Sequence, residues 1–248
     1  MSSTGRQSLL ILFFSWCWFL LSESNIFPVL LIPSPPAVIN GFYNAFLQDK
    51  LIIDFIFTIG RMIVGLTCGI MIGIILGLLI GSCSITKEII VWVDFLRSIP
   101  GVALFPIFML AFGLGETAKI SLVIFATSLV MIVNTIYGIK NTNPTRLMIA
   151  KTLNFSKIQT ISKIVFMESL PFISAGIRQA ISYSLIMVIV SEMFMGTRYG
   201  LGKKIIDYYL TYNTNKMYAI IILTGLIGYL SNRLYIYFET KKIHWVGK

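Results

Sequence analysis

The chain has 248 residues, of which 56% are hydrophobic and 12% charged, and its formal net charge is +10. Soluble domains carry about twice that charged fraction, so the composition excludes an ordinary soluble domain and predicts a polytopic membrane protein. The lysines and arginines lie mostly in loops beside apolar spans, which favours a topological role, and we expect no nucleic-acid partner. Three cysteines and a single histidine, His244, are too few for a metal site or for histidine acid–base catalysis. We therefore expect no catalytic residue, metal or cofactor.

Apolar stretches follow one another along the chain, and a membrane-spanning helix needs roughly 20 such residues. They predict an all-α fold with a single membrane domain over residues 1–248. The expected spans are approximately 9–21, 55–80, 89–112, 120–139, 170–194 and 217–238. The first span resembles a signal peptide, but LSESN is a poor cleavage site, so we expect a retained anchor.

Prolines modify two regions of this pattern. The linker 26–38 is rich in proline, which lacks a backbone N–H and disfavours helix before it. We therefore expect an extended connector there. The third span is interrupted by Pro100 and Pro106.

An even number of spans places both termini on the same side of the membrane. If that side is the cytoplasm, the inside segments hold more lysines and arginines than the outside segments, as the positive-inside bias requires. This orientation puts the long basic insertion 140–168 inside the cell. Its length and helical periodicity predict a docking surface for a soluble partner, and the alternative is an amphipathic helix at the membrane surface.

The second span carries glycines at a strict spacing of four residues. Residues four apart lie along one stripe of a helix, and the missing side chains let another backbone approach closely. We interpret the stripe as a helix-packing surface, with a direct role in transport as the alternative. It consists of Gly65, Gly69, Gly73, Gly77 and Gly81.

Ionisable residues inside apolar spans are candidates for function, because a charge in lipid is costly. Asp94 and Arg97 lie three residues apart on one helical face and predict a local ion pair. Arg61 has no partner close to it in the sequence. Arg178 and Glu192 share the fifth span, but roughly 21 Å of helix separates them, so they cannot pair within it.

The fifth span is also rich in small and hydroxyl-bearing residues. Such a helix either lines a polar pathway or packs tightly against its neighbours, and the sequence leaves both interpretations open. The candidate pathway-lining residues are Ser174, Gly176, Arg178, Ser182 and Glu192.

The segment 196–204 looks superficially like a phosphate-binding loop. Its glycines Gly196 and Gly202 are separated by one residue more than that motif requires, and Lys204 stands where serine or threonine would contact the metal. We therefore expect that this chain itself binds no nucleotide.

Several blocks in order along the chain resemble the permease subunits of binding-protein-dependent ABC importers. Within them, the chain is most similar to the nitrate/sulfonate/taurine group, which includes pyrimidine-precursor transporters. The run LPFISAGIRQA (170–180) resembles the family's L-P-x-I-x-x-G-I/V-R-x-A segment, and SEMFMGTRYGLG (191–202) resembles its E-M…G-L-G segment. Further blocks resemble the segment after the first span, the glycine-rich second span and the third span: LIPSPPAV (31–38), TIGRMIVGLTCGIMIGIILGLLIG (58–81) and DFLRSIPGVALFPIFMLAFGLGETAKI (94–120).

The family's cytoplasmic loop motif, E-A-A-x3-G-x9-I-x-L-P, falls on residues 148–167, where only Ala150 and Ile164 agree with it. The resemblance implies that this loop forms short coupling helices that seat in a groove of a cytoplasmic ATPase. Met148 replaces the acidic residue of the motif, and Asn154 replaces its turn glycine. Asparagine tolerates positive φ better than most residues. The implied contact residues are Ala150, Lys151, Thr152, Leu153, Asn154, Phe155 and Ser156.

The resemblance implies a type I ABC importer permease in a bacterial inner membrane, with both termini cytoplasmic. The implied partners are an ATPase dimer, a second copy of this chain in a homodimer, an external solute-binding protein and membrane lipid. The implied solute is a sulfonate, nitrate, taurine or a pyrimidine precursor. The alternative is an ATP-independent secondary transporter or channel, which predicts paired charges or an internal repeat at the bilayer midplane. A membrane enzyme ranks third, because no cluster of reactive side chains is evident.

Overall fold

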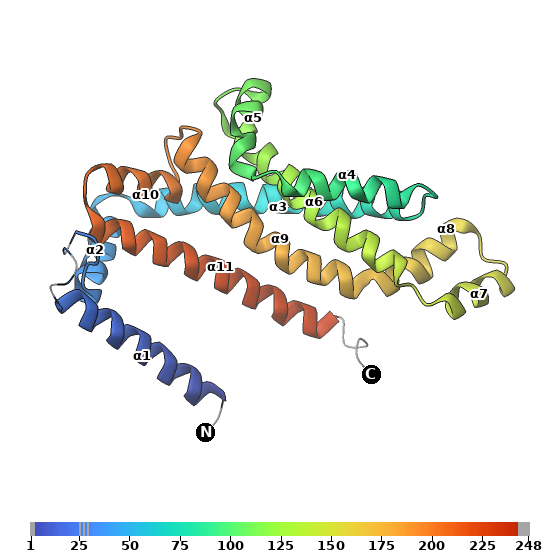
Figure 1. Ribbon diagram of the computed structural model, residues 1–248, viewed down its shortest axis with the longest axis horizontal. Coiled ribbons are helices and arrows are strands. Elements are labelled where there is room, and N and C mark those ends of the chain that lie inside the picture. The colour runs from blue at the N-terminus through green and yellow to red at the C-terminus, as the bar shows by residue number, and fades with distance from the viewer. Residues whose placement is uncertain (1–2, 25, 27, 29, 243–248) are drawn as a thin grey trace.

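The computed structural model describes residues 3–24, 26, 28 and 30–242, and the regular secondary structure in these residues is entirely helical. The helices form an elongated bundle, with the short helices α7 and α8 at one end and α2 and α10 at the other (Figure 1). The elements are α1 (Ser3–Glu23), α2 (Pro35–Gln48), α3 (Leu51–Gly81), α4 (Thr86–Ser98), η1 (Gly101–Leu104), α5 (Phe105–Phe112), α6 (Glu116–Lys140), α7 (Pro144–Thr152), α8 (Lys157–Thr160), η2 (Ile161–Val165), α9 (Phe166–Phe194), α10 (Leu201–Leu210) and α11 (Thr214–Lys242).

In the described part of the chain, four helices are long and apolar enough to cross a membrane: α3, α6, the continuous helix Lys157–Phe194 and α11. A fifth crossing results if α4 and the segment Gly101–Phe112 count as one bent span. In α1, the apolar stretch Leu12–Glu23 is shorter. Each of the six expected ranges coincides with helical structure, and how many of them cross the membrane stays a prediction.

Proline accounts for two local features of the chain. The third expected range bends by 89° between α4 and the segment Gly101–Phe112. Ile99, directly before Pro100, is extended with φ −73° and ψ 122°, because the proline ring disfavours helix in the residue before it. The expectation of an extended connector is wrong for its last residues, since α2 begins at Pro35. The first helical position suits proline, because the N–H there has no partner within the helix.

The glycine stripe of α3 packs against α6, which is the most buried of the candidate spans. A Cβ added at Gly73 would lie 2.8 Å from the backbone oxygen of Ser128, and one at Gly77 would lie 2.5 Å from the Cβ of Thr135. The two helices run parallel, because residues that increase in number along α3 meet residues that increase in number along α6. From Gly65 to Gly81, the facing residues of α6 are Val123, Thr127, Met131, Thr135 and Ile139.

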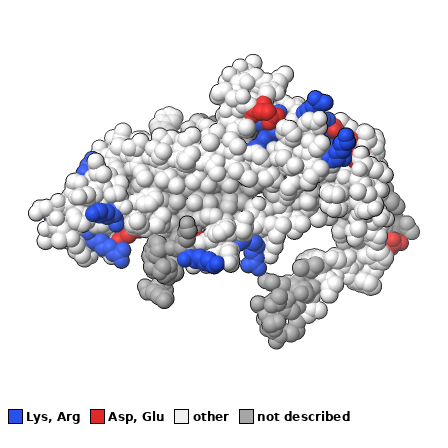
Figure 2. Space-filling view, turned by 180° about the vertical axis from the view of Figure 1, so that it is seen from behind, with Lys and Arg blue, Asp and Glu red and all other residues white. Residues whose placement is uncertain are grey.

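α9 packs on another side of α6, and α11 lies beside α9, α10 and α2 (Figure 1). The chain therefore builds its core around α6, whose side chains are buried along most of the helix. On the face shown in Figure 2, the middle of the molecule is largely uncharged, and most lysines and arginines lie toward its ends and lower edge. This distribution suits a protein whose middle faces lipid.

Candidate functional site

The insertion 140–168 folds into a helical hairpin, α7–turn–α8, that projects beyond the ends of α6 and α9 (Figure 1). The turn closes with two backbone hydrogen bonds, from the N–H of Phe155 to Ala150 O (2.9 Å) and from the N–H of Asn154 to Lys151 O (3.0 Å). This pair defines a Schellman motif, which requires a left-handed residue after the helix end. Asn154 is that residue, with φ 54°.

The second helix of the hairpin begins with a reciprocal cap. The Ser156 Oγ accepts a hydrogen bond from the N–H of Gln159 (3.2 Å), and the Gln159 side chain accepts one from the N–H of Ser156 (2.9 Å). Such a capping box satisfies two backbone donors that would otherwise lack partners. The short turn between α7 and α8 is thus fixed by its own local hydrogen bonds.

An ion pair fixes the hairpin to the end of α9. Arg146 on α7 lies 2.7 Å from a carboxylate oxygen of Glu168, and the N–H of Asn143 donates to the same carboxylate at 2.7 Å. Glu168 lies near the start of α9, within the continuous helix Lys157–Phe194. The ion pair therefore ties α7 to the start of α9.

The outer surface of the hairpin carries several exposed apolar side chains. Leu153 is 61% exposed, and the hydrophobic side chains of Met148, Ile149 and Ile158 are also exposed. Of the expected contact residues, Ala150 is only 1% exposed, so it packs inside the hairpin and does not reach its surface. The sequence interpretation omitted Ile149 and Ile158 from the contact, although an apolar residue in a polar loop was the available signal.

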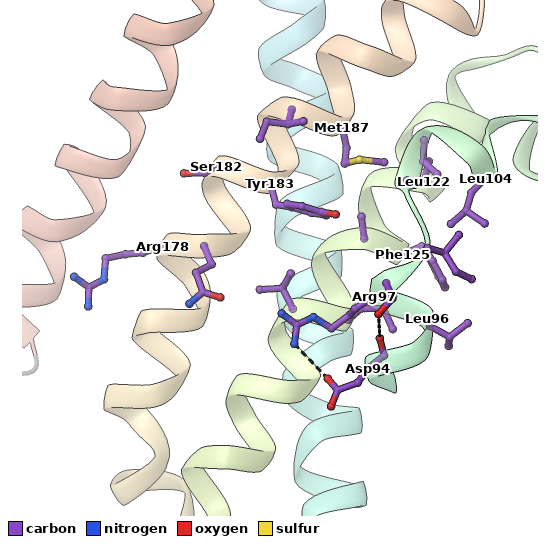
Figure 3. A pocket seen from close by; sticks show the side chains of 18 of the residues that line it. Asp94, Leu96, Arg97, Leu104, Leu122, Phe125, Arg178, Ser182, Tyr183 and Met187 are labelled. Atoms are coloured by element: carbon purple, nitrogen blue, oxygen red, sulfur yellow. Dashed lines mark hydrogen bonds and ion pairs between the residues drawn. The ribbon is translucent and has the colours of Figure 1, made fainter. Parts of the chain in front are cut away.

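A cavity of about 990 Å³ lies between α4, η1, α6, α9 and α11 (Figure 3). Leu122, Phe125 and Ala126 of α6, with Met187 of α9, give it an apolar wall. The lining also includes further apolar residues, such as Leu96, Leu129 and Ile236, and the polar side chains of Arg97, Arg178, Gln179, Ser182, Tyr183 and Asn232. The cavity thus offers both hydrocarbon and hydrogen-bonding groups.

The arginines of the cavity form only loose ion pairs. Arg97 lies 3.5 Å from Asp94 and Arg178 lies 3.6 Å from Glu239, measured between nitrogen and oxygen, whereas a charge-assisted hydrogen bond is about 2.7–2.9 Å long. Among the described residues, neither guanidinium donates a hydrogen bond to the protein. Arg97 extends from α4 toward α9, whereas Arg178 points toward α11 (Figure 3).

The structure separates the candidate pathway residues of the fifth span. Arg178 and Ser182 line the cavity. Ser174 does not, because it is 1% exposed and donates a hydrogen bond to Glu239 of α11. Gly176 faces α6, where an added Cβ would lie 2.8 Å from a side-chain carbon. Only one face of a helix meets a given cavity, and these two residues lie on other faces of α9.

Glu192, the remaining candidate, belongs to a buried polar cluster at the far end of the bundle. Arg61 donates to Glu116 (2.5 and 2.8 Å) and to Glu192 (2.6 Å), which also accepts hydrogen bonds from Thr58 and from the N–H of Gly202 at 2.9 Å. Glu192 is 1% exposed and does not line the cavity, and the bonds of this cluster join α3, α6, α9 and α10. That it lines a pathway stays a prediction. Sequence reasoning missed the pairing because Arg61 lies 55 and 131 residues from its carboxylates.

A second set of contacts joins the segments around α10. The N–H of Gly200, a residue with φ 152°, donates to Asp54 at 2.7 Å. Asp49, between α2 and α3, accepts hydrogen bonds from the hydroxyl of Tyr208 (2.7 Å) and from the Lys216 ammonium (2.6 Å). Burial acts to raise the pKa of Asp49, but these hydrogen bonds outweigh it and hold the pKa below its ordinary value.

Comparison with known proteins adds the following similarities. Residues 69–244 match the sequence family described as "Binding-protein-dependent transport system inner membrane component". The putative aliphatic sulfonates transport permease protein SsuC of Bacillus subtilis is 28% identical over 232 residues, which cover 92% of this chain and 83% of that protein. The nitrate import permease protein NrtB of Synechocystis sp. is 27% identical over 219 residues, which cover 84% and 79%. A solved structure of the MetNI methionine ABC transporter in an inward-facing conformation shares the fold, with a TM-score of 0.67 and 18% identity over 77% of this chain and 95% of that one.

Proposed function

The chain belongs to the family of binding-protein-dependent transport system inner membrane components, and we propose on that basis that its α7–α8 hairpin seats in a separate ATPase subunit. As a member of this family it is the membrane-spanning permease subunit of an ATP-binding-cassette importer. The observation that carries the proposal is the exposed apolar surface of the hairpin, centred on Leu153. A rigid projection with apolar side chains at its tip fits a groove on a partner, because the fixed turn leaves little entropy to lose on binding.

The hairpin would pass ATP-driven motion to the membrane helices. Closure of an ATPase dimer moves α7 and α8, and the Arg146–Glu168 ion pair delivers that movement to the start of α9. α9 lines the cavity, so its displacement changes access to it. We propose that two copies of this chain form the pathway and that both chain termini lie in the cytoplasm.

An external binding protein would deliver the solute at the opposite end of the bundle. Segments 113–119 and 196–216 lie at that end, next to the buried Arg61 cluster. The relatives transport aliphatic sulfonates and nitrate by their names, and an anion of this kind is the proposed solute.

The test is purification of the tagged, full-length chain from its native membranes, followed by identification of the proteins that accompany it. We expect a stoichiometric ATPase that is lost in the variant Leu153→Glu. The control is Leu210→Glu, which places the same charge on a residue that is 66% exposed, at the end of α10. If the ATPase stays bound to Leu153→Glu, the hairpin is not its seat. If a stable chain yields no ATPase at all, the ATP-independent transporter becomes the better interpretation.

A further inference from the structure

The α7–turn–α8 hairpin carries positive charge and no negative charge of its own. Between Glu116 and Glu168 the sequence contains no aspartate or glutamate. Within that range, residues 140–167 hold five cations: Lys140, Arg146, Lys151, Lys157 and Lys163. Any surface that receives the hairpin therefore meets cations only.

Three of these cations are held within the fold or lie away from the turn. Arg146 pairs with Glu168 at 2.7 Å. The ammonium of Lys163 lies over the ring of Phe155, 5.5 Å from the ring centre. Lys140 is the last residue of α6, before the hairpin begins. Two lysines remain that belong to the tip itself.

These two lysines flank the exposed apolar tip. Lys151 lies two residues before Leu153, and Lys157 lies directly before Ile158. Leu153 and Ile158 are 61% and 79% exposed, and both lysines are exposed as well. In the described part of the chain, neither ammonium forms an ion pair. A partner that covers the two apolar side chains therefore also meets both ammonium groups.

The charge of that partner surface follows from the cost of desolvation. An ammonium group that is brought against protein loses water, and this loss is costly unless an acceptor such as a carboxylate replaces the water. Lysines or arginines in the groove would repel the tip, whereas opposite charge favours the correct partner and speeds the encounter. Met148, which is 66% exposed, stands where the resembled motif has an acidic residue, so the hairpin offers no anion to a cation of the groove.

We propose that the ATPase groove that receives this hairpin is acidic. Aspartate or glutamate side chains of the ATPase face Lys151 and Lys157, around an apolar floor that covers Leu153 and Ile158. This inference rests on the proposed function, because it describes the partner of the same hairpin. It also adds a selection rule, since an ATPase whose groove is basic does not fit this chain.

Anionic lipid is the other source of negative charge for a basic, partly apolar segment. A segment that lies on the membrane surface runs across the bundle. The hairpin instead projects beyond the ends of α6 and α9, along the length of the bundle (Figure 1). This direction carries the tip away from the membrane and favours a protein partner.

The first experiment uses the full-length, tagged chain in complex with the ATPase that co-purifies with it. A carbodiimide joins a lysine directly to a carboxylate that it touches, and mass spectrometry of the peptides identifies both residues. We expect Lys151 and Lys157 to be joined to aspartates or glutamates of the ATPase. An amine-to-amine reagent is the control for proximity. Joining of these lysines to the ATPase by that reagent alone, or by neither reagent, overturns the proposal. Carbodiimide products with phosphatidylserine in place of the ATPase overturn it in favour of the membrane.

The second experiment measures the affinity of the same purified ATPase for charge variants of the chain. Lys151→Gln/Lys157→Gln should weaken binding about 2- to 25-fold at low salt, the usual effect of losing two exposed ion pairs. The difference from the wild type should shrink between about 0.05 and 0.5 M salt, because salt screens exposed charges.

Lys87→Gln/Lys241→Gln is the matched control. It removes the same charge from exposed lysines at the start of α4 and near the end of α11, which lie toward the same end of the bundle as the hairpin (Figure 1). Equal weakening by the two double variants, or weakening that does not depend on salt, overturns the proposal. If a variant does not fold, the crosslinks of the wild-type chain decide the question.

The variant Leu153→Glu separates this inference from the proposed function. If Leu153→Glu loses the ATPase while Lys151→Gln/Lys157→Gln binds like the wild type at every salt concentration, the hairpin is the seat and its groove is not acidic. If the ATPase stays bound to Leu153→Glu, the proposed seat is wrong and the acidic groove fails with it. Loss in Leu153→Glu together with salt-dependent weakening in Lys151→Gln/Lys157→Gln supports both.

Discussion

A single methyl group placed on the glycine stripe should separate α3 from α6. In Gly73→Ala, the added Cβ would lie 2.8 Å from the backbone oxygen of Ser128 and against the Cβ of Met131. Real Cβ atoms essentially never approach closer than 3.0 Å, and neither neighbour is the end of a flexible side chain, so the helices themselves must move. Overpacking of this kind costs about 1–3 kcal/mol.

Gly60→Ala is the matched control in the same helix. No atom lies within 4 Å of a Cβ added there, and replacing an exposed helical glycine with alanine stabilises by about 0.5–1 kcal/mol. This gain is common to both positions in α3, so the two variants should differ by the overpacking cost alone, about 1–3 kcal/mol. For a chain of this length, that corresponds to roughly 2–12 °C in melting temperature.

The assay is thermal unfolding of the detergent-purified chain, followed by tryptophan fluorescence and by the fraction that remains monodisperse. We expect Gly73→Ala to melt below the wild type and Gly60→Ala to melt at or above it. Equal shifts in the same direction would refute the packing argument, because they would show that the cost of alanine does not depend on what faces it.

Three further predictions concern other parts of the structure. Asn154→Val should weaken ATPase capture and Asn154→Gly should retain it, because a β-branched residue at φ 54° costs about 1–2 kcal/mol; a pull-down with both variants measures this. Arg61→Met leaves Glu192 buried without its cation and should destabilise the chain by about 3–5 kcal/mol, whereas the double variant Arg61→Met/Glu192→Met should recover much of that loss in a melting experiment. Asp49 has a lowered pKa, so its stabilising contacts are complete at neutral pH and are lost as the pH falls through that pKa; Asp49→Asn should therefore reduce the loss of melting temperature between neutral pH and about pH 3.

The sequence was informative where the signal was local. Apolar runs marked all the long helices, and the spacing of the glycines indicated a packing stripe before its partner was known. The replacement of a turn glycine by Asn154 led to the expectation that the backbone there needs positive φ, and the structure gives this residue φ 54°. Each of these features depends on residues within a few turns of one another.

Features that depend on distant residues were not accessible in the same way. The partners of Arg61 come from α6 and α9, and only the fold brings them together. Whether Ser174 and Gly176 line the cavity depends on which face of α9 meets it. The sequence does not show how a helix is rotated about its axis.

The matched spacing on α3 and α6 has a consequence for how the two helices are aligned. Both facing rows repeat every four residues, so sliding α3 by four residues, about 6 Å, brings each glycine opposite the next residue of the same row. The stripe therefore sets how close the helices lie, but it does not by itself choose among alignments that differ by one turn. The directional bonds of Arg61 to Glu116 at the end of the pair favour one alignment, because a shift of α3 would break them.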